Sequence, residues 1–303
     1  MDISVLLATY NRNDILVRTI QSFCELNTDG LEWEVVVVDN ANNKETQELV
    51  AGFRGKLPIK CLVEEKQGKN HALNKALEIA EGNLFIFTDD DIIANRDWLV
   101  EMWAGAGRWA DYSIFGGRIL PEFPPGRVPI NKESRFFNGA YVLADWDIGE
   151  GEYSLYKVWG PNMAIRSKVF HNGLKFNGDI GPKGNDYIMG SETELLLRLG
   201  EAGLRAIYLP KCLVHHIIRP EQVKEEWLYG RAFRKGRMQA QRSGKEDVPY
   251  LFKIPRYLYR QLAEAAMNRL LNLFNPELRM EHAMQHWMIR GVIHQYRLES
   301  KGF

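Results

Sequence analysis

Three consecutive carboxylates, Asp89, Asp90 and Asp91, follow a short apolar run at residues 84–88. Adjacent negative charges repel one another, so a purely structural role for all three would be costly. Carboxylate oxygens at the end of a buried strand suit Mg²⁺ or Mn²⁺, which binds one or two carboxylates and takes further ligands from substrate phosphates. The pattern therefore predicts a divalent metal site, and a solvated turn that caps the next helix is the alternative.

The first hundred residues alternate between strand and helix patterns, which would position these aspartates. We expect strands at 3–9, 33–38, 59–63 and 84–88, and helices at 14–24, 46–53 and 68–80. Fully apolar strands joined by amphipathic helices predict a mostly parallel, Rossmann-like α/β sheet covered on both faces. Ligands of such sheets bind at the carboxyl ends of the strands, where the polar turns after residues 9, 38 and 88 would meet.

The pattern changes beyond residue 120. Prolines interrupt a long loop at 120–157, a strand is expected at 162–166, and a second loop spans 173–190. A helix then begins at residue 191, and strands are expected at 206–209 and 213–218. The remainder is helical and basic. We therefore expect a catalytic domain at 1–220 and a helical extension at 221–303.

The composition is that of an ordinary globular protein, with 45% apolar and 26% charged residues. The net charge is zero, but it divides into −7 for residues 1–218 and +7 for residues 219–303. The three cysteines form no recognisable framework, and neither a signal-peptide pattern nor a membrane-spanning apolar run is present. We expect a cytoplasmic protein, either free or peripheral at the inner face of the membrane, with no nucleic-acid partner.

Apolar residues recur at helical spacing through the C-terminal part, from Leu258 to Phe274, with arginines between them. Such a stripe is typical of a core or of a homodimer contact. A basic amphipathic helix that lies on an anionic membrane has the same pattern. Both interpretations stay open at this point.

Six short motifs occur in a characteristic order along residues 3–240. They are LATYNR at 7–12, VVDNAN at 37–42, GKNHALN at 68–74, FTDDD at 87–91, GPNMA at 160–164 and GSETEL at 190–195. In this order and spacing the chain resembles the inverting family 2 glycosyltransferases. The resemblance implies a nucleotide-sugar-binding fold of GT-A type, a donor metal on the aspartates, and inversion at the anomeric carbon.

The resemblance also implies a donor site. The turn of Ala8, Thr9 and Tyr10, with Arg12, matches the family's nucleoside cradle. Asp39 matches the aspartate that meets the nucleobase. A carboxylate that accepts from a ring N–H suits uracil, so a UDP-sugar is favoured, and an Asx turn is the alternative.

Further donor and metal contacts follow by position. Lys69 would lie beside the donor phosphates, and Asn74 would either face the crevice or only cap and pack. We assign Asp89 and Asp90 to the nucleotide sugar as well. The metal ligands would be Asp89, Asp91 and His215, and His215 is preferred to His216 by alignment alone.

Glu192 is the candidate general base, because a carboxylate within hydrogen-bond reach can take the proton of an attacking acceptor. Ser191 and Glu194 fit a capping box, which would leave Glu192 free for the site. The family usually has Glu-Asp at positions 191–192, whereas this chain has Ser-Glu. This departure keeps open a sugar-nucleotide-binding protein with lost or altered catalysis.

Other enzyme classes are less consistent with the motifs. A sugar nucleotidyltransferase would want a glycine-rich basic loop after the first strand, and a dinucleotide oxidoreductase would need G-x-G-x-x-G there. The Gln-x-x-Arg-Trp signature of processive family members is missing, which favours single sugar addition. The acceptor is not identified: a glycan, a lipid-linked or a small molecule would fit, with bacterial cell-surface polysaccharide or glycolipid synthesis as the expected setting.

Overall fold

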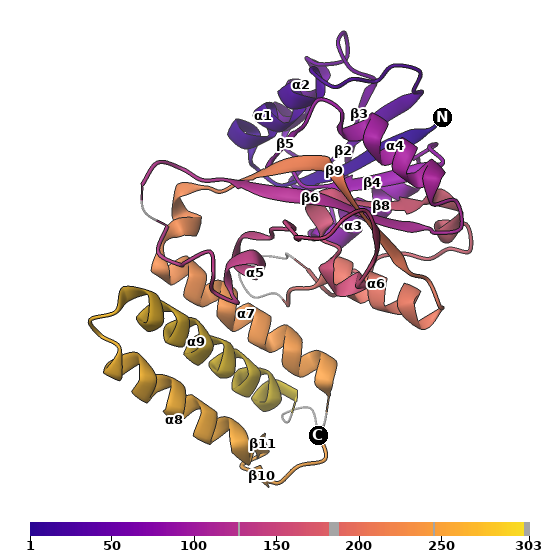
Figure 1. Cartoon of the computed structure of the whole chain (residues 1–303). Helices are drawn as coiled ribbons and strands as arrows, with labels where there is room; N and C mark the ends of the chain where they lie inside the picture. The colour runs from indigo at the N-terminus through magenta and orange to yellow at the C-terminus, as the bar shows by residue number, and fades with distance from the viewer. Residues whose placement is uncertain (127, 182–187, 245, 300–303) are drawn as a thin grey trace. The chain divides into compact units, whose positions relative to one another are not determined.

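The computed structural model describes residues 1–126, 128–181, 188–244 and 246–299 (Figure 1). The chain divides into two compact units. Unit 1 comprises Met1–Glu122, Val142–Asn185 and Gly190–Ile217. Unit 2 comprises Phe123–Tyr141, Asp186–Met189 and Ile218–Phe303. The helical unit thus begins near the expected boundary at residue 220, and it also takes residues 123–141 from the long loop.

Unit 1 is built on a nine-stranded mixed sheet with the order β3-β2-β1-β4-β8-β6-β9-β5, in which β7 also pairs with β9. The strands are β1 (Ile3–Thr9), β2 (Trp33–Asp39), β3 (Ile59–Val63), β4 (Leu84–Thr88), β5 (Ile92–Ala94), β6 (Ile114–Glu122), β7 (Gly151–Tyr153), β8 (Met163–Arg166) and β9 (Ala206–Ile217). Strands β1 to β4 pair in parallel, and so do β6 and β9. The expected mostly parallel α/β fold is confirmed.

The helices of unit 1 are α1 (Asn13–Phe23), α2 (Lys44–Ala51), α3 (Lys69–Leu77), α4 (Trp98–Arg108) and α6 (Ser191–Glu201). Helices α3 and α6 share one core with β4, because Leu73 and Leu195 pack with Phe85 and Phe87. Phe23 of α1 and Trp98 of α4 stack with their ring centroids 5.9 Å apart. Helices α1, α2, α3 and α6 agree with helices expected from the sequence, whereas α4 was not predicted.

Two predicted features differ from the structure. The aspartates lead directly into β5, which pairs antiparallel with β9, so they do not cap a helix. The two strands expected at 206–209 and 213–218 form the single strand β9, whose pairing with β6 shifts register between Gly117 and Arg118. An irregularity of this kind adds residues to one strand without ending it, which is why Pro210 does not break β9.

Unit 2 contains α5 (Phe137–Tyr141), α7 (Glu225–Ser243), α8 (Arg256–Leu271) and α9 (Pro276–Glu299), with a small hairpin of β10 (Tyr250–Leu251) and β11 (Ile254–Pro255). Helices α7 and α9 run side by side (Figure 1). They approach closely at Gly236 and Gly291, where a Cβ would lie 1.9 Å from the Met288 carbonyl oxygen and 2.0 Å from that of Phe233. Among the described residues, no helix is long and apolar enough to cross a membrane.

Candidate active site

The aspartate turn after β4 is anchored to β1 and α1. The Thr9 hydroxyl donates to Asp90 Oδ2 at 2.7 Å, and the Thr19 hydroxyl donates to the Asp90 carbonyl at 2.8 Å. Thr19 also accepts from the Ile92 amide at 3.1 Å, so it holds both sides of the turn. Thr19 was not among the predicted site residues, because its place on α1 has no motif around it.

Arg12 neutralises two of the three aspartates. Its Nη1 lies 2.9 Å from Asp90 Oδ1 and 3.4 Å from Asp91 Oδ2. Burial raises the pKa of Asp90 to about 6, although Arg12 acts in the opposite direction. Both oxygens of Asp90 are engaged inside the protein, so its position is that of an internal support for the turn. The expected contact of Asp90 with the donor stays a prediction.

Lys69, in the first turn of α3, bonds to the remaining aspartate, Asp89, and to the candidate base, Glu192. Its Nζ lies 2.5 Å from Asp89 Oδ1 and 2.6 Å from Glu192 Oε1. Burial lowers the pKa of the Lys69 ammonium, but the two carboxylates outweigh that effect and raise it. A protonated lysine therefore holds Asp89 and Glu192 within reach of a single nitrogen atom. All three side chains keep some exposure, at 18–25%.

Glu192 lies at the start of α6, against the loop that precedes β8. A Cβ at Gly160 would lie 2.5 Å from Glu192 Oε1, so only glycine leaves room for this carboxylate. The Thr88 hydroxyl donates to the Pro161 carbonyl at 2.8 Å and fixes the same loop to β4. The loop of Gly160, Pro161 and Asn162 thus positions the candidate base. This contact with Glu192 was not predicted from the sequence.

The expected capping box at the start of α6 is wrong. Gly190, with φ 103°, is the N-cap, and Ser191 is the first helical residue. Glu194 instead pairs with Arg198 one turn later, at 2.8 Å. A positive φ at the N-cap is readily adopted by glycine, which explains why serine does not take this position. Glu194 nevertheless has a structural partner, as the prediction required.

The structure places His216, and not the predicted His215, beside Asp91. The distance from His216 Nε2 to Asp91 Oδ1 is 3.4 Å, and His216 is buried. Adjacent residues of β9 point to opposite faces, so His215 lies on the other side of the strand. The sequence showed that only one of the pair could reach the aspartates, but which one depends on how β9 pairs with β5.

Three asparagines hold loops in place. Asn74 both donates to and accepts from the Phe176 backbone, at 2.9 and 2.8 Å. Its amide is thereby used in packing, the second of the two roles expected for it, and its contact with the donor stays a prediction. Asn70 donates to Asn177 and Ile180 carbonyls of the same loop. Asn40, which was not predicted, accepts from the Gly68 amide at 2.7 Å just before Lys69.

Asp39 forms the turn after β2 and is fully buried. Its carboxylate accepts from the backbone amides of Ala41 and Asn43, at 3.0 and 2.6 Å, and from the Gln47 side chain at 3.1 Å. The Asx-turn alternative is thus present in the structure. Asn43 also donates to Asn11 at 2.9 Å, which ties this turn to the one after β1. In the latter turn Ala8 is half-buried and Tyr10 is 47% exposed.

Within the described ranges, no three His, Cys, Asp or Glu side chains converge in a way that could hold a metal ion. Arg12 and Lys69 lie against the carboxylates and supply the positive charge there. Asp91 and His216 form a pair of oxygen and imidazole donors at the end of β4, and this pair suits Mn²⁺ or Mg²⁺. The residues present therefore fit part of a metal site.

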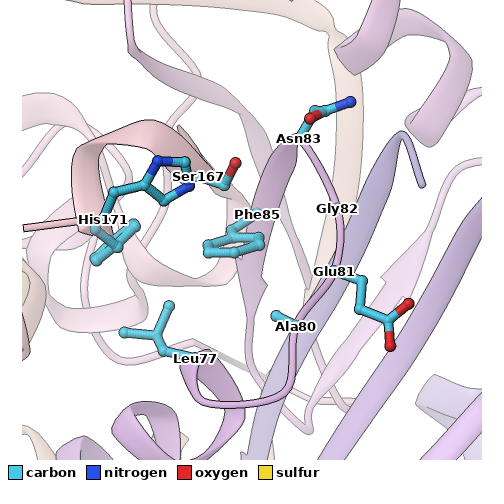
Figure 2. Close-up of a pocket in the computed structure, with 9 residues that line it drawn as sticks. Leu77, Ala80, Glu81, Gly82, Asn83, Phe85, Ser167 and His171 are labelled. Carbon is cyan, nitrogen blue, oxygen red and sulfur yellow. The ribbon is translucent and has the colours of Figure 1, made fainter. Parts of the chain in front are cut away.

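A separate pocket of about 260 Å³ lies at the amino end of β4 (Figure 2). Leu77, Phe85 and His171 line it, and the Glu81 side chain turns away from it in this view. None of the predicted site residues borders this pocket. Ligands of parallel sheets bind at the opposite, carboxyl ends, so the pocket is not the donor site.

Comparison with known proteins agrees with the motifs and the fold. Residues 4–145 match the family model for glycosyl transferase family 2. The chain is 24% identical over 243 residues to the glucosyl-dolichyl phosphate glucuronosyltransferase of Haloferax volcanii. This match covers 78% of this chain and 75% of the relative.

Solved glycosyltransferases share the fold. A mannosyltransferase from Pyrobaculum calidifontis, determined in complex with GDP-Man and Mn²⁺, superposes with a TM-score of 0.63 at 20% identity, over 97% of this chain and 86% of that protein. Residues 1–349 of S. aureus TarS, determined with UDP-GlcNAc, superpose with a TM-score of 0.57 at 18% identity, over 100% of this chain and 92% of that one. Unit 1 with its helical extension thus has the GT-A type of architecture.

Proposed function

We propose that this chain transfers a sugar from a nucleotide-diphosphate donor to an acceptor hydroxyl, with inversion at the anomeric carbon. The observation that carries the proposal is the bridge from Lys69 to Asp89 and Glu192, at 2.5 and 2.6 Å. It brings a candidate base next to the aspartate turn that the family uses for the donor. The match of residues 4–145 to the family model supports the same reaction class.

In this proposal Glu192 takes the proton of the acceptor hydroxyl as that oxygen attacks the sugar. Lys69 has two effects on the base. Its charge favours the ionised carboxylate, and its hydrogen bond fixes the orientation of Glu192. Gly160 leaves space for the carboxylate of Glu192, because a Cβ there would lie 2.5 Å from Glu192 Oε1. The helix N-terminus of α6 favours the negative charge as well.

The donor would lie over the turns after β1 and β2. Ala8, Thr9 and Tyr10 are proposed to form the nucleoside cradle, in which Tyr10 offers an exposed aromatic face. The proposal of a UDP-sugar rests on Asp39, whose carboxylate already accepts three hydrogen bonds within the turn. Similar proteins were determined with GDP-Man and with UDP-GlcNAc, so the choice of base is tested below.

A divalent ion, Mn²⁺ or Mg²⁺, is proposed to be held by Asp91 and His216, with its further ligands supplied by the donor diphosphate. When bound, it would neutralise the negative charge of the leaving diphosphate. His216 replaces the predicted His215 here, because only His216 lies against Asp91. Asp90 and Arg12 support the turn that presents these ligands.

The acceptor is proposed to be lipid-linked, in a pathway that builds glycolipid or cell-surface polysaccharide. The Haloferax relative is named for a dolichyl-phosphate acceptor, which is consistent with such a substrate class. The three described cysteines are free, which suits a reducing cytoplasm. A soluble acceptor would be the outcome if lipid-linked acceptors fail in the assay described next.

The test uses the purified chain with a panel of UDP- and GDP-sugars, with Mn²⁺ or with EDTA. We expect the folded state to be stabilised by one nucleotide series, since a ligand that binds only the folded state raises its apparent stability. The stabilising donor is then assayed for transfer to lipid-linked and to soluble acceptors and for hydrolysis, and NMR of the product reports the anomeric configuration. Donor binding without transfer or hydrolysis would show a binding protein instead, and a retained configuration would refute the direct displacement.

A further inference from the structure

The turn between α8 and α9 exposes an unusual concentration of large apolar side chains. Six lie within twelve consecutive residues, and we name them the apolar turn: Met267 at 60% exposed, Leu270 at 65%, Leu271 at 74%, Leu273 at 53%, Phe274 at 101% and Leu278 at 44%. Single exposed apolar residues are normal on protein surfaces, but a contiguous group marks an interaction site.

The apolar turn remains exposed after the core of unit 2 has formed. On the inner face of α8, Leu258 and Ala265 are buried at 3% and 4% against Ile289 and Val292 of α9. The C-terminal stripe predicted from the sequence therefore divides in two. Its first part packs inside the unit, and the side chains of its last part, Leu270, Leu271 and Phe274, are exposed. The turn that joins α8 to α9 lies at the end of these two helices (Figure 1).

The charge of the unit indicates the chemistry of the partner. Unit 2 contains 19 Lys and Arg against 11 Asp and Glu, a net charge of +8, whereas unit 1 carries −8. The exposed face of α8 that leads to the apolar turn begins with Arg256 and Arg260 and contains one acid, Glu264. Apolar side chains in the turn, with basic residues on the adjoining helix, suit the boundary between lipid headgroups and acyl chains.

We propose that the apolar turn inserts into the surface of an anionic lipid bilayer, with Leu271 and Phe274 at its centre. The shape favours this partner over a second copy of the chain, because Phe274 projects fully from a turn and a stable dimer needs a broad complementary face. The basic residues of unit 2 add electrostatic attraction, which salt screens. This inference concerns unit 2 alone and does not depend on the proposed transfer reaction.

The test is co-sedimentation of the full chain with vesicles. We expect binding to phosphatidylcholine vesicles that contain phosphatidylglycerol, weaker binding to phosphatidylcholine alone, and release at moderate salt. The double variant Leu271→Glu/Phe274→Glu should lose about tenfold or more of the binding, because two exposed apolar side chains that would enter the lipid become charged. Ile148→Glu, which changes an exposed residue of unit 1, is the matched control and should bind normally.

Circular dichroism and nucleotide-induced stabilisation establish that each variant is folded and that unit 1 is unchanged. Equal sedimentation of the wild type and the double variant would overturn the proposal. So would a dimer, seen by light scattering, that ignores vesicles and dissociates in the double variant, because the apolar turn would then bind its own copy. A failure of sugar transfer leaves the vesicle result unaffected, so the two hypotheses are tested separately.

Discussion

The two cations next to the aspartate turn have different functions. Arg12 bonds to Asp90, whose carboxylate is buried, and completes a support inside the fold. Lys69 bonds to Asp89 and Glu192, which remain partly exposed. An ion pair that retains solvent access can exchange its partners when a charged ligand arrives, whereas a buried pair is costly to break. The Arg12 side chain is 40% exposed and that of Lys69 is 18% exposed, so an incoming diphosphate could meet either cation, but only Lys69 is paired with partly exposed carboxylates.

The two glutamates of the first turn of α6 should be separable by mutation. Glu192→Gln should keep the fold and the donor affinity but lose about 10²–10⁴-fold in transfer rate, the usual range for loss of a general base. Glu194→Gln breaks the pair with Arg198 and should cost at most about 1 kcal/mol of stability, with turnover kept. Steady-state kinetics with thermal melting measure both. If Glu194→Gln removes transfer and Glu192→Gln does not, the roles are exchanged.

The metal ligands can be tested by binding of the nucleotide alone. UDP binding, measured by calorimetry with Mn²⁺, should weaken in EDTA and in Asp91→Ala and His216→Ala. His215→Ala is the matched control, since this neighbour lies on the opposite face of β9, and it should bind UDP as the wild type does. Equal affinity under all of these conditions would remove the metal from the proposal.

At the scale of the elements, single glycines determine how closely neighbouring segments approach each other. Gly160 faces a flexible carboxylate, whereas Gly236 and Gly291 face backbone atoms of the opposing helix. A side chain can move aside at small cost, but two packed helix backbones cannot. Glycine therefore leaves room for the proposed base in unit 1, and it allows two helix backbones to approach closely in unit 2.

Gly160→Ala should thus impair transfer without unfolding the protein. The added methyl group would lie 2.5 Å from Glu192 Oε1 and must displace that carboxylate. Misplacement of a reacting group by about 1 Å can cost on the order of 100-fold in rate. Kinetics and melting temperature measure the effect, and a wild-type rate would show that Glu192 does not act from this position.

Gly291→Ala is the contrasting change in unit 2. Its methyl group would lie 2.0 Å from the Phe233 carbonyl oxygen, so α7 and α9 must move apart. Overpacking of this kind typically costs about 1–3 kcal/mol. Urea unfolding should show this loss, while donor binding by the folded fraction is kept. Unchanged stability would mean that the two helices are not packed as closely as described.

At the scale of the molecule, unfolding should depend on pH through His286 of α9. Burial, followed by the charges of Arg290 and Arg269, lowers the pKa of His286 from its usual 6.5. The unfolded chain then binds the proton more readily, so this contribution to stability is complete above pH 6.5 and declines as the pH falls through the lower folded pKa. His286→Gln should flatten that part of the pH profile in urea unfolding, with His171→Gln as a surface control. An unchanged profile in His286→Gln would contradict this.

The sequence by itself determined the fold class, the resemblance to family 2 glycosyltransferases and the order of the site motifs. Apolar runs such as residues 35–38 are fully buried strands, and the turns that follow β1 and β4 do meet at Thr9 and Asp90. Strand periodicity and turn composition are local properties, so they can be recognised without a three-dimensional structure. The family motifs are local in the same sense.

Only the tertiary structure decided which atoms face each other. His216 rather than His215 lies against Asp91 because β5 sets the register of β9, and strand faces alternate with every residue. Asn74 packs against Phe176, and Lys69 reaches Glu192, across 102 and 123 positions of sequence. The C-terminal stripe divides between the core and the apolar turn because α9 covers only one face of α8. Contacts between distant segments depend on how the elements pack, and local patterns carry no information about that packing.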